Sequence, residues 1–186
     1  MGILEAIFLG ILQGLTEFLP VSSSGHLVLF QNIFETPGDM LFFDTMLHVG
    51  TLVAVFIVLW KDIAEIFHHL FARFTWVLVV ATIPAVVAGV LLGDFFEGAF
   101  EGTYLAFGFL ITSVLLVISE RVAAGKKAKY TDKNQIGFGT ALGVGCMQAV
   151  AILPGISRSG STLSGSLIAG LDRSLAASFS FLMSIP

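Results

Sequence analysis

The chain has 186 residues, of which 56% are hydrophobic and 12% are charged, and its formal net charge is −4. A mean hydropathy of +0.95 leaves too little polar surface for a soluble domain, so the composition predicts an integral membrane protein. The few charges form no basic face, which excludes nucleic acid as a partner. The single cysteine, Cys146, excludes an intrachain disulfide.

The first region, residues 3–34, is apolar but is broken near its middle by a polar run. Because its start lacks basic residues and includes Glu5, we expect a retained membrane segment and not a cleaved signal. Pro20 lacks a backbone N–H and therefore ends the first helix, and the serines after it are favoured N-caps for the next one. The remaining piece, 26–34, is too short to cross a bilayer of ~30 Å. The region predicts a re-entrant pair of helices.

Three stretches in the middle of the chain each contain about 20 apolar residues, which is enough to cross a bilayer of ~30 Å. They are roughly 42–60, 74–93 and 103–120. At the outer end of the first stretch, Asp44 and His48 lie one helical turn apart. They either hold a metal or lie at the membrane interface, and we expect the interface.

A second broken region, residues 136–170, repeats the first with an offset of 135 residues. Gln148 matches Gln13 and Ser157 matches Ser22 at that offset, with a Leu-Pro step between them in each copy. The copy predicts a second re-entrant helix pair, and broken helices repeated in this way usually mark a binding site in a membrane protein. The alternative is a chance match among residues that are common in this chain.

The end of the chain carries two weaker indications. Small residues around Gly139 and Gly143 are expected to allow close helix packing in the second pair. After that pair the chain enters a new apolar segment and stops at Pro186, so we expect a C-terminally incomplete protein.

Basic residues are concentrated in one loop. Five of the nine lie between the third span and the second broken region: Arg121, Lys126, Lys127, Lys129 and Lys133. The positive-inside rule places this loop in the cytoplasm. Alternation then places the 61–73 loop inside, and outside it places the 35–41 loop, with Glu35 and Asp39, and the acidic loop of Asp94, Glu97 and Glu101. The two broken regions therefore enter from opposite faces.

Together these features predict an all-α polytopic membrane protein with inverted-topology repeats and two re-entrant broken-helix pairs. Residues 1–186 would form a single membrane domain, with the first repeat over about 1–93 and the second from about 103, cut at 186.

Glu17 is an ionisable residue within an apolar stretch, where a charge costs roughly 2.5–3.5 kcal/mol on insertion scales. It needs a partner or a wet cavity, so we expect a functional role; an interfacial position is the alternative. Gln13 lies four residues earlier and shares its helix face. It either belongs to the site or makes an ordinary hydrogen bond between helices.

Arg158 in the second copy is the natural counterpart of Glu17, because a guanidinium presents a planar fork of donors that matches phosphate oxygens. Each serine-rich turn also begins a short helix, whose free N–H groups attract anions. The predicted phosphate receptor combines Ser22, Ser24 and Gly25 with Ser157, Ser159 and Gly160. In the structural alternative, these serines and Ser161 are helix caps, and Arg158 forms a salt bridge with Glu17.

His26 follows the first turn, and its imidazole either transfers a proton, attacks phosphorus or is a hydrogen-bonded core group. A carboxylate, serines, a histidine and an arginine beside two helix N-termini suit phosphoryl transfer, which depends on positioning and charge neutralisation. Glu17 would hold Mg²⁺ together with phosphate oxygens and water. The chain lacks the His and Cys spacing of a zinc site.

Two motifs carry a resemblance to a known family. The run Gln13-Gly-Leu-Thr-Glu17 through Ser-Ser-Ser-Gly-His26 resembles the (E/Q)xxxE region of the undecaprenyl-diphosphatases, the bacitracin-resistance family. Pro154-Gly-Ile-Ser-Arg-Ser-Gly-Ser-Thr162 resembles their PGxSRSxxT motif. Phe43-Asp44 through Leu52 looks like a third, looser signature. The order of membrane segments fits along the whole chain, although family members are about half as long again.

The resemblance implies hydrolysis of undecaprenyl diphosphate to the monophosphate and inorganic phosphate, which recycles the lipid carrier of bacterial cell-wall synthesis and confers bacitracin resistance. It implies Mg²⁺ or another divalent cation such as Ca²⁺, a bacterial plasma-membrane location and a site open to the outer, periplasmic side. By motif position, the catalytic residues would be Glu17, Ser23, His26 and Arg158, with Gln13, Ser157 and Thr162 at further motif positions. We interpret Ser23 as nucleophile, His26 as acid or base, Arg158 as phosphate clamp and Glu17 as metal ligand, although the match leaves the attacking group open.

The alternative function is a lipid or anion transporter or flippase, since broken helices in inverted repeats are also transporter architecture. A transporter needs the anion receptor but no nucleophile or proton-transfer group, so Ser23 and His26 favour the enzyme. A purely structural scaffold leaves the charges of Glu17 and Arg158 without a reason. The expected partners are the lipid substrate, membrane lipid and a second copy of the chain in a homodimer.

Overall fold

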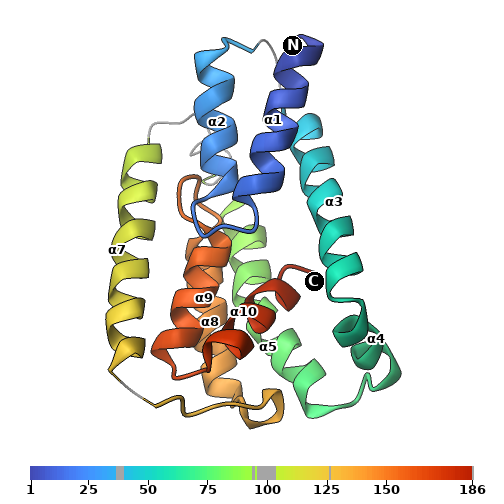
Figure 1. Cartoon of the computed structure of the whole chain (residues 1–186), viewed down its shortest axis with the longest axis vertical. Helices are drawn as coiled ribbons and strands as arrows, with labels where there is room; N and C mark the ends of the chain where they lie inside the picture. The colour runs from blue at the N-terminus through green and yellow to red at the C-terminus, as the bar shows by residue number, and fades with distance from the viewer. Residues whose placement is uncertain (37–39, 94, 96–103, 126, 186) are drawn as a thin grey trace.

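The computed structural model describes residues 1–36, 40–93, 95, 104–125 and 127–185. Over these ranges the regular secondary structure is helical (Figure 1), in the order α1 (Ile3–Thr16), α2 (Ser23–Ile33), α3 (Leu41–Val58), α4 (Trp60–His68), α5 (Arg73–Leu91), α7 (Leu105–Ala124), the short 3₁₀ helix η1 (Lys133–Gln135), α8 (Phe138–Val150), α9 (Arg158–Ile168) and α10 (Arg173–Leu182). The all-α prediction is confirmed. Pro186, where we expected an incomplete chain, lies outside the described residues.

Within the described ranges, three helices, α3, α5 and α7, are long and apolar enough to cross a membrane. They correspond to the spans predicted at 42–60, 74–93 and 103–120. The apolar helices α1 and α8 have only 14 and 13 residues, which is too short for ~30 Å at a rise of ~1.5 Å per residue. The chain is therefore a polytopic membrane protein, as predicted.

Each broken region forms a helical hairpin, α1 with α2 and α8 with α9. α1 ends at Thr16 and α8 at Val150, in each case four residues before the proline. In a helix the carbonyls of these two residues would accept the N–H groups of Pro20 and Pro154, which proline lacks, so the helix ends one turn upstream of the proline itself. Figure 1 shows the hairpins entering from opposite ends of the molecule, with their turns facing each other near its middle. That the two copies are inverted repeats stays a prediction.

The two hairpins meet at glycines beside α7. A Cβ atom built on Gly25 would lie 2.9 Å from the Cα of Gly155, and one built on Gly108 of α7 would lie 2.7 Å from the same Cα. Gly155 has a φ of +88°, a conformation that favours glycine. The hydroxyl of Thr112 on α7 donates to the carbonyl of Gly155 at 3.1 Å and accepts from the N–H of Ser157 at 3.0 Å. These contacts fix the second turn against α7.

The hydrophobic core lies mainly between α4, α5, α8, α9 and α10. α5 and α8 approach so closely that a Cβ built on Gly145 would lie 2.1 Å from the carbonyl oxygen of Ala81. The close helix contact expected at Gly139 and Gly143 is not made within the described chain, because no heavy atom beyond their own chain neighbours and helix backbone lies within 4 Å of a Cβ built on either. Gly145 lies on the face turned to α5, and the other two glycines do not.

The sequence predicts a loop over 61–73, whereas the structure has α4 over most of it. Ile63 is 2% exposed and belongs to the core, while Glu65 remains at the surface and accepts a hydrogen bond from Lys133 at 2.5 Å. Ile63 anchors this short helix, and Ile66 packs against the same core. The charges of Lys61, Asp62 and Glu65 favour a loop, although the spacing of Ile63, Ile66 and Phe67 is that of one helix face.

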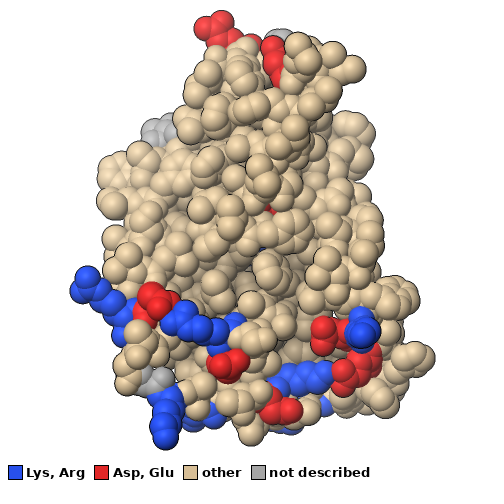
Figure 2. Space-filling model, viewed as in Figure 1, with Lys and Arg blue, Asp and Glu red and all other residues tan. Residues whose placement is uncertain are grey.

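Charged residues mark one end of the molecule. Figure 2 shows Lys and Arg on the visible face gathered toward the end that contains α4 and the α7–α8 connection, beside a wide band that is almost entirely free of Lys and Arg. That connection carries the predicted cytoplasmic residues Lys127, Lys129 and Lys133, and α7 ends beside Arg121. Lys126, Asp39 and the acidic-loop residues Asp94, Glu97 and Glu101 lie outside the described residues.

Candidate active site

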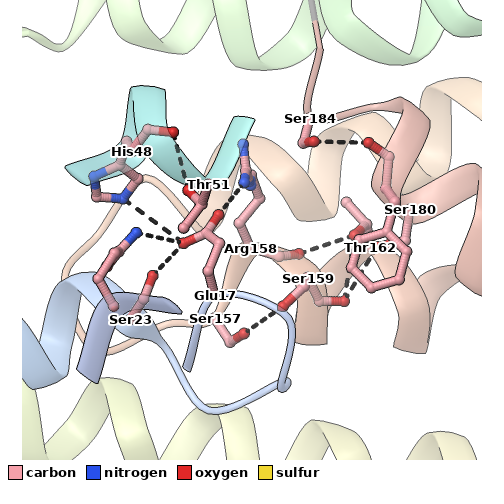
Figure 3. A network of polar contacts seen from close by, with 12 residues as sticks. Glu17, Ser23, His48, Thr51, Ser157, Arg158, Ser159, Thr162, Ser180 and Ser184 are labelled. Carbon is pink, nitrogen blue, oxygen red and sulfur yellow. Dashed lines mark hydrogen bonds and ion pairs between the residues drawn. The ribbon is translucent and has the colours of Figure 1, made fainter. Parts of the chain in front are cut away.

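Glu17 is the centre of a polar cluster to which α1, α2, α3 and α9 all contribute (Figure 3). Its Oε1 accepts a hydrogen bond from Nη2 of Arg158 at 2.5 Å. Its Oε2 accepts from Oγ of Ser23 at 2.5 Å and from Nε2 of Gln13 at 3.0 Å, and lies 3.8 Å from Nε2 of His48. The Glu17 side chain is only 11% exposed. The carboxylate is therefore enclosed by donors from both hairpins.

The end of α1 places the first two residues of the cluster. Glu17 is the C-cap of α1, and its backbone N–H donates to the carbonyl of Gln13 at 2.9 Å. One helical turn separates the two side chains, so the prediction that they share a face is confirmed. Gln13 is fully buried, and its Oε1 has no hydrogen-bond partner within the described part of the chain.

Arg158 brings the second hairpin into the cluster. It is the first residue of α9, beside the turn that meets the first hairpin. The Oγ of Ser159 donates to the carbonyl of Leu19 at 3.4 Å, which ties the start of α9 to the α1–α2 turn. The salt bridge with Glu17 that we weighed as the structural alternative is present, yet the Arg158 side chain remains 40% exposed. The guanidinium is paired and still accessible.

The two hairpins cap their second helices in the same way. Ser22 Oγ accepts from the N–H of Gly25 at 3.3 Å, and Ser157 Oγ accepts from the N–H of Gly160 at 3.0 Å. The prediction that these serines are N-caps is confirmed. Ser22 also has a φ of +64°, a left-handed conformation that costs about 1–3 kcal/mol in a residue other than glycine. Such strain clusters at functional sites, and here it precedes Ser23, whose hydroxyl faces Glu17.

A cavity of about 820 Å³ opens beside this cluster, a volume typical of small-molecule sites. Seven predicted site residues line it: Glu17, Ser22, Ser23, Ser24, Ser157, Arg158 and Ser159. The lining continues past the end of α2 to Thr36 and to Leu41 at the start of α3, which lie toward the end of the molecule opposite the basic loop. Polar groups from the cluster thus form one part of the cavity wall. The rest of the wall extends toward the end of the molecule that lies away from the basic α7–α8 connection.

Five predicted site residues are not among those that line the cavity: Gln13, Gly25, His26, Gly160 and Thr162. The Nδ1 of His26 lies 2.8 Å from the carbonyl oxygen of Ser22, and its ring packs edge-on against Phe109. Thr162 Oγ1 donates to the carbonyl of Arg158 at 2.9 Å. His26 and Thr162 thus support the turns that carry the cluster. The proton-transfer role of His26 stays a prediction.

His48 is a residue of the cluster that sequence analysis did not include in the site, because we expected it with Asp44 at the membrane interface. Both line the cavity. The Nδ1 of His48 lies 2.8 Å from the carbonyl oxygen of Asp44, which leaves Nε2 toward Glu17. Across the cavity, Nε2 of Gln31 donates to Oδ1 of Asp44 at 2.7 Å. The four-residue spacing of Asp44 and His48 predicts that they share one face of a helix. It does not predict whether that face meets the cavity or the membrane interface.

The oxygen atoms at and near Glu17 are suitable ligands for a hard divalent cation. The carboxylate of Glu17 and the hydroxyl of Ser23 are the kind of oxygen ligands that Mg²⁺ and Ca²⁺ prefer, and the buried Oε1 of Gln13 is an unused acceptor one turn away. Among the described residues, no three His, Cys, Asp or Glu side chains come together as a metal cluster. A cation at Glu17 would therefore need further oxygen atoms from a bound substrate and from water.

Known proteins show a consistent similarity. The profile of the family described as bacitracin resistance protein BacA matches residues 6–186. The chain is 45% identical to an undecaprenyl-diphosphatase of Carboxydothermus hydrogenoformans over all of its own length and 70% of the relative's. It is 46% identical to undecaprenyl-diphosphatase 4 of Bacillus thuringiensis subsp. konkukian and 42% identical to an undecaprenyl-diphosphatase of Methanosphaera stadtmanae, covering 71% and 74% of their lengths. The chain therefore belongs to the bacitracin resistance protein BacA family.

Proposed function

We propose that this chain is an integral membrane phosphatase that hydrolyses undecaprenyl diphosphate to undecaprenyl phosphate and inorganic phosphate. In bacterial cell-wall synthesis this reaction would recycle the lipid carrier and confer resistance to bacitracin. The observation that carries the proposal is the hydroxyl of Ser23, hydrogen-bonded at 2.5 Å to the carboxylate of Glu17, which is itself paired with Arg158 in a cavity of about 820 Å³. The names of the relatives support the choice of substrate.

In this proposal Ser23 is the nucleophile. Its Oγ attacks the terminal phosphorus while its proton passes to Oε2 of Glu17, which is already within hydrogen-bond reach. The bond from phosphorus to the bridging oxygen breaks, and undecaprenyl phosphate leaves. Water then attacks the phosphoserine, and Glu17 returns the proton to Oγ as inorganic phosphate departs.

Arg158 and the first turns of α2 and α9 would bind the phosphate oxygens. A guanidinium at the start of a helix adds its fixed charge to the positive end of the helix dipole. Glu17 would hold Mg²⁺ or Ca²⁺, and such a cation would supply further charge neutralisation at the transferring phosphoryl group.

We also propose that the site opens to the outer face of the bacterial plasma membrane. The cavity lining extends toward the end opposite the loop with Lys127, Lys129 and Lys133. Since basic loops stay in the cytoplasm, this arrangement favours entry of the substrate from the outer side.

The test is release of inorganic phosphate from undecaprenyl diphosphate by the purified chain in detergent with Mg²⁺. We expect release, and we expect Glu17→Ala and Arg158→Ala each to lower its rate by at least about 10²-fold, since both act on charge in the transition state. Arg173→Ala is the matched control: Arg173 is 61% exposed and pairs with Glu120 at the basic end. Binding of the lipid without phosphate release would contradict the enzyme and favour the transporter.

A further inference from the structure

We propose that the divalent cation and the lipid diphosphate each bind this site more tightly when the other is bound, because Arg158 occupies the carboxylate of Glu17 until a phosphate group takes its place. The inference rests on the proposed function, whose substrate and cation it uses. It assigns Arg158 two successive partners, Glu17 in the free protein and a phosphate group in the complex.

The first step is that Glu17 already has partners on both carboxylate oxygens in the free protein. Its Oε1 accepts from Arg158 at 2.5 Å, and its Oε2 accepts from both Ser23 and Gln13. Each carboxylate oxygen already accepts at least one hydrogen bond, and a cation at Oε1 would lie beside the guanidinium of Arg158. Arg158 is also a full positive charge at contact distance, which repels a divalent cation. In the free protein the carboxylate is thus a poor ligand, even though its chemistry suits the ion.

The second step is that Arg158 can change partner. Its side chain is 40% exposed and lines the cavity, whereas that of Glu17 is 11% exposed. A diphosphate in the cavity offers several anionic oxygens in the geometry that a guanidinium binds bidentately. When Arg158 turns to them, Oε1 of Glu17 loses its donor and its compensating charge together. A divalent cation at Oε1 then supplies the positive charge that Arg158 no longer provides.

The third step is that the protein alone does not complete a cation site. The described residues contain no cluster of three or more His, Cys, Asp or Glu side chains. Glu17 must therefore share the ion with oxygen atoms of the diphosphate, as is usual for Mg²⁺. The same diphosphate removes Arg158 and supplies ligands, so each ligand raises the affinity for the other.

The experiment measures cation binding without turnover. The purified full chain in detergent is titrated with Mn²⁺, followed by the electron paramagnetic resonance signal of the free ion, with and without a non-hydrolysable isoprenyl methylenediphosphonate. We expect the analogue to tighten Mn²⁺ binding roughly 10-fold or more, and Mn²⁺ to tighten analogue binding by the same factor, because coupling between two ligands is reciprocal. Equal Mn²⁺ affinity with and without the analogue would overturn the proposal.

Two variants separate the steps. Arg158→Gln frees Glu17, so Mn²⁺ should bind more tightly than in the wild type when no analogue is present, and the analogue should add little. Glu17→Gln should abolish Mn²⁺ binding while analogue binding, measured separately without metal, becomes tighter because Arg158 is released. Arg173→Gln removes the same charge at the basic end and should behave as wild type. Unchanged Mn²⁺ binding in folded Arg158→Gln would also contradict the proposal.

The result is independent of the hydrolysis assay. If phosphate is released but the two ligands bind without coupling, the proposed function stands and this inference fails. If binding of the two ligands is coupled but no phosphate is released, the enzyme proposal fails. The inference that Arg158 exchanges Glu17 for a phosphate group then stands. The wild-type titration needs no substitution, so it decides the matter even if a variant does not fold.

Discussion

At the residue scale, the partners of Glu17 compensate for the cost of placing a carboxylate within an apolar region. A lone charge there is costly, and Glu17 avoids the cost by taking four polar neighbours, among them an arginine 141 residues away in the chain. Breaking such a pair leaves the other charge uncompensated. Variants at Glu17 or Arg158 therefore mix structural and catalytic effects, and Ser23, a neutral group, gives a cleaner test.

Ser23→Ala removes the proposed nucleophile without changing charge. We expect the rate of phosphate release to fall by at least about 10³-fold. Without the Ser23 hydroxyl, only water remains to attack the phosphorus atom, and it attacks directly. Acid quenching of the wild type during turnover should trap phosphate on Ser23, detected by mass spectrometry. Ser113→Ala is the control, since that exposed hydroxyl on α7 donates only to the carbonyl of Phe109 among the described contacts. Near-normal turnover in Ser23→Ala would assign the attack to water.

Substitutions of His48 test whether the cluster around Glu17 needs this residue for activity. Its Nε2 lies 3.8 Å from Oε2 of Glu17, a longer contact than those of Ser23 and Arg158, so we expect His48→Ala to lower kcat/KM only about 10-fold. His48→Gln keeps a polar side chain of similar reach and should recover part of that loss. Two variants with equal activity would show that the contact with Glu17 is not the reason for any effect. Wild-type activity in both would remove His48 from the site.

At the element scale, the features that could be predicted are those with a single strong physical cause. The three spans are predictable because a helix must contain about 20 apolar residues to cross a bilayer. The two hairpins are predictable because proline has no backbone N–H to donate to the preceding helix turn. α4 was missed because a short charged segment between two spans favours a loop, although Ile63 and Ile66 have the spacing of one helix face. His48 was missed for a different reason: spacing reveals which side chains share a face, and only packing decides what that face meets.

Helix packing between α5 and α8 gives a prediction with a control two residues away. A Cβ at Gly145 would lie 2.1 Å from the carbonyl oxygen of Ala81, a backbone atom that cannot turn aside. Gly145→Ala should therefore cost about 1–3 kcal/mol of stability through overpacking, seen as a lower Tm in detergent. Gly143→Ala, for which no described atom lies within 4 Å of the new Cβ, should not lower Tm. Equal melting temperatures for the two variants would refute this close approach.

At the scale of the whole molecule, two hairpins from opposite ends place complementary chemistry at one point. The first contributes the carboxylate and the hydroxyl of Ser23, and the second contributes Arg158. Neither hairpin alone forms the site, and the close approach of Gly25 at the start of α2 to Gly155 in the α8–α9 turn holds the two halves together. The meeting of Glu17 and Arg158 was predictable only as a hypothesis, since an offset of 135 residues between copies says nothing about distance in space.

The direction of the molecule in the membrane follows from its charges. The basic loop should face the cytoplasm, and the cavity end should face outward. Single cysteines at Lys127 and at Glu35, both exposed positions near opposite ends, test this in a Cys146→Ala background, because the native cysteine is itself exposed. In intact cells, a membrane-impermeant maleimide should label Glu35→Cys at once and Lys127→Cys only after permeabilisation. The reverse pattern would place the cavity on the cytoplasmic side. Substrate would then have to reach Ser23 and Arg158 from inside the cell, and a role in recovering carrier released at the outer face would be lost.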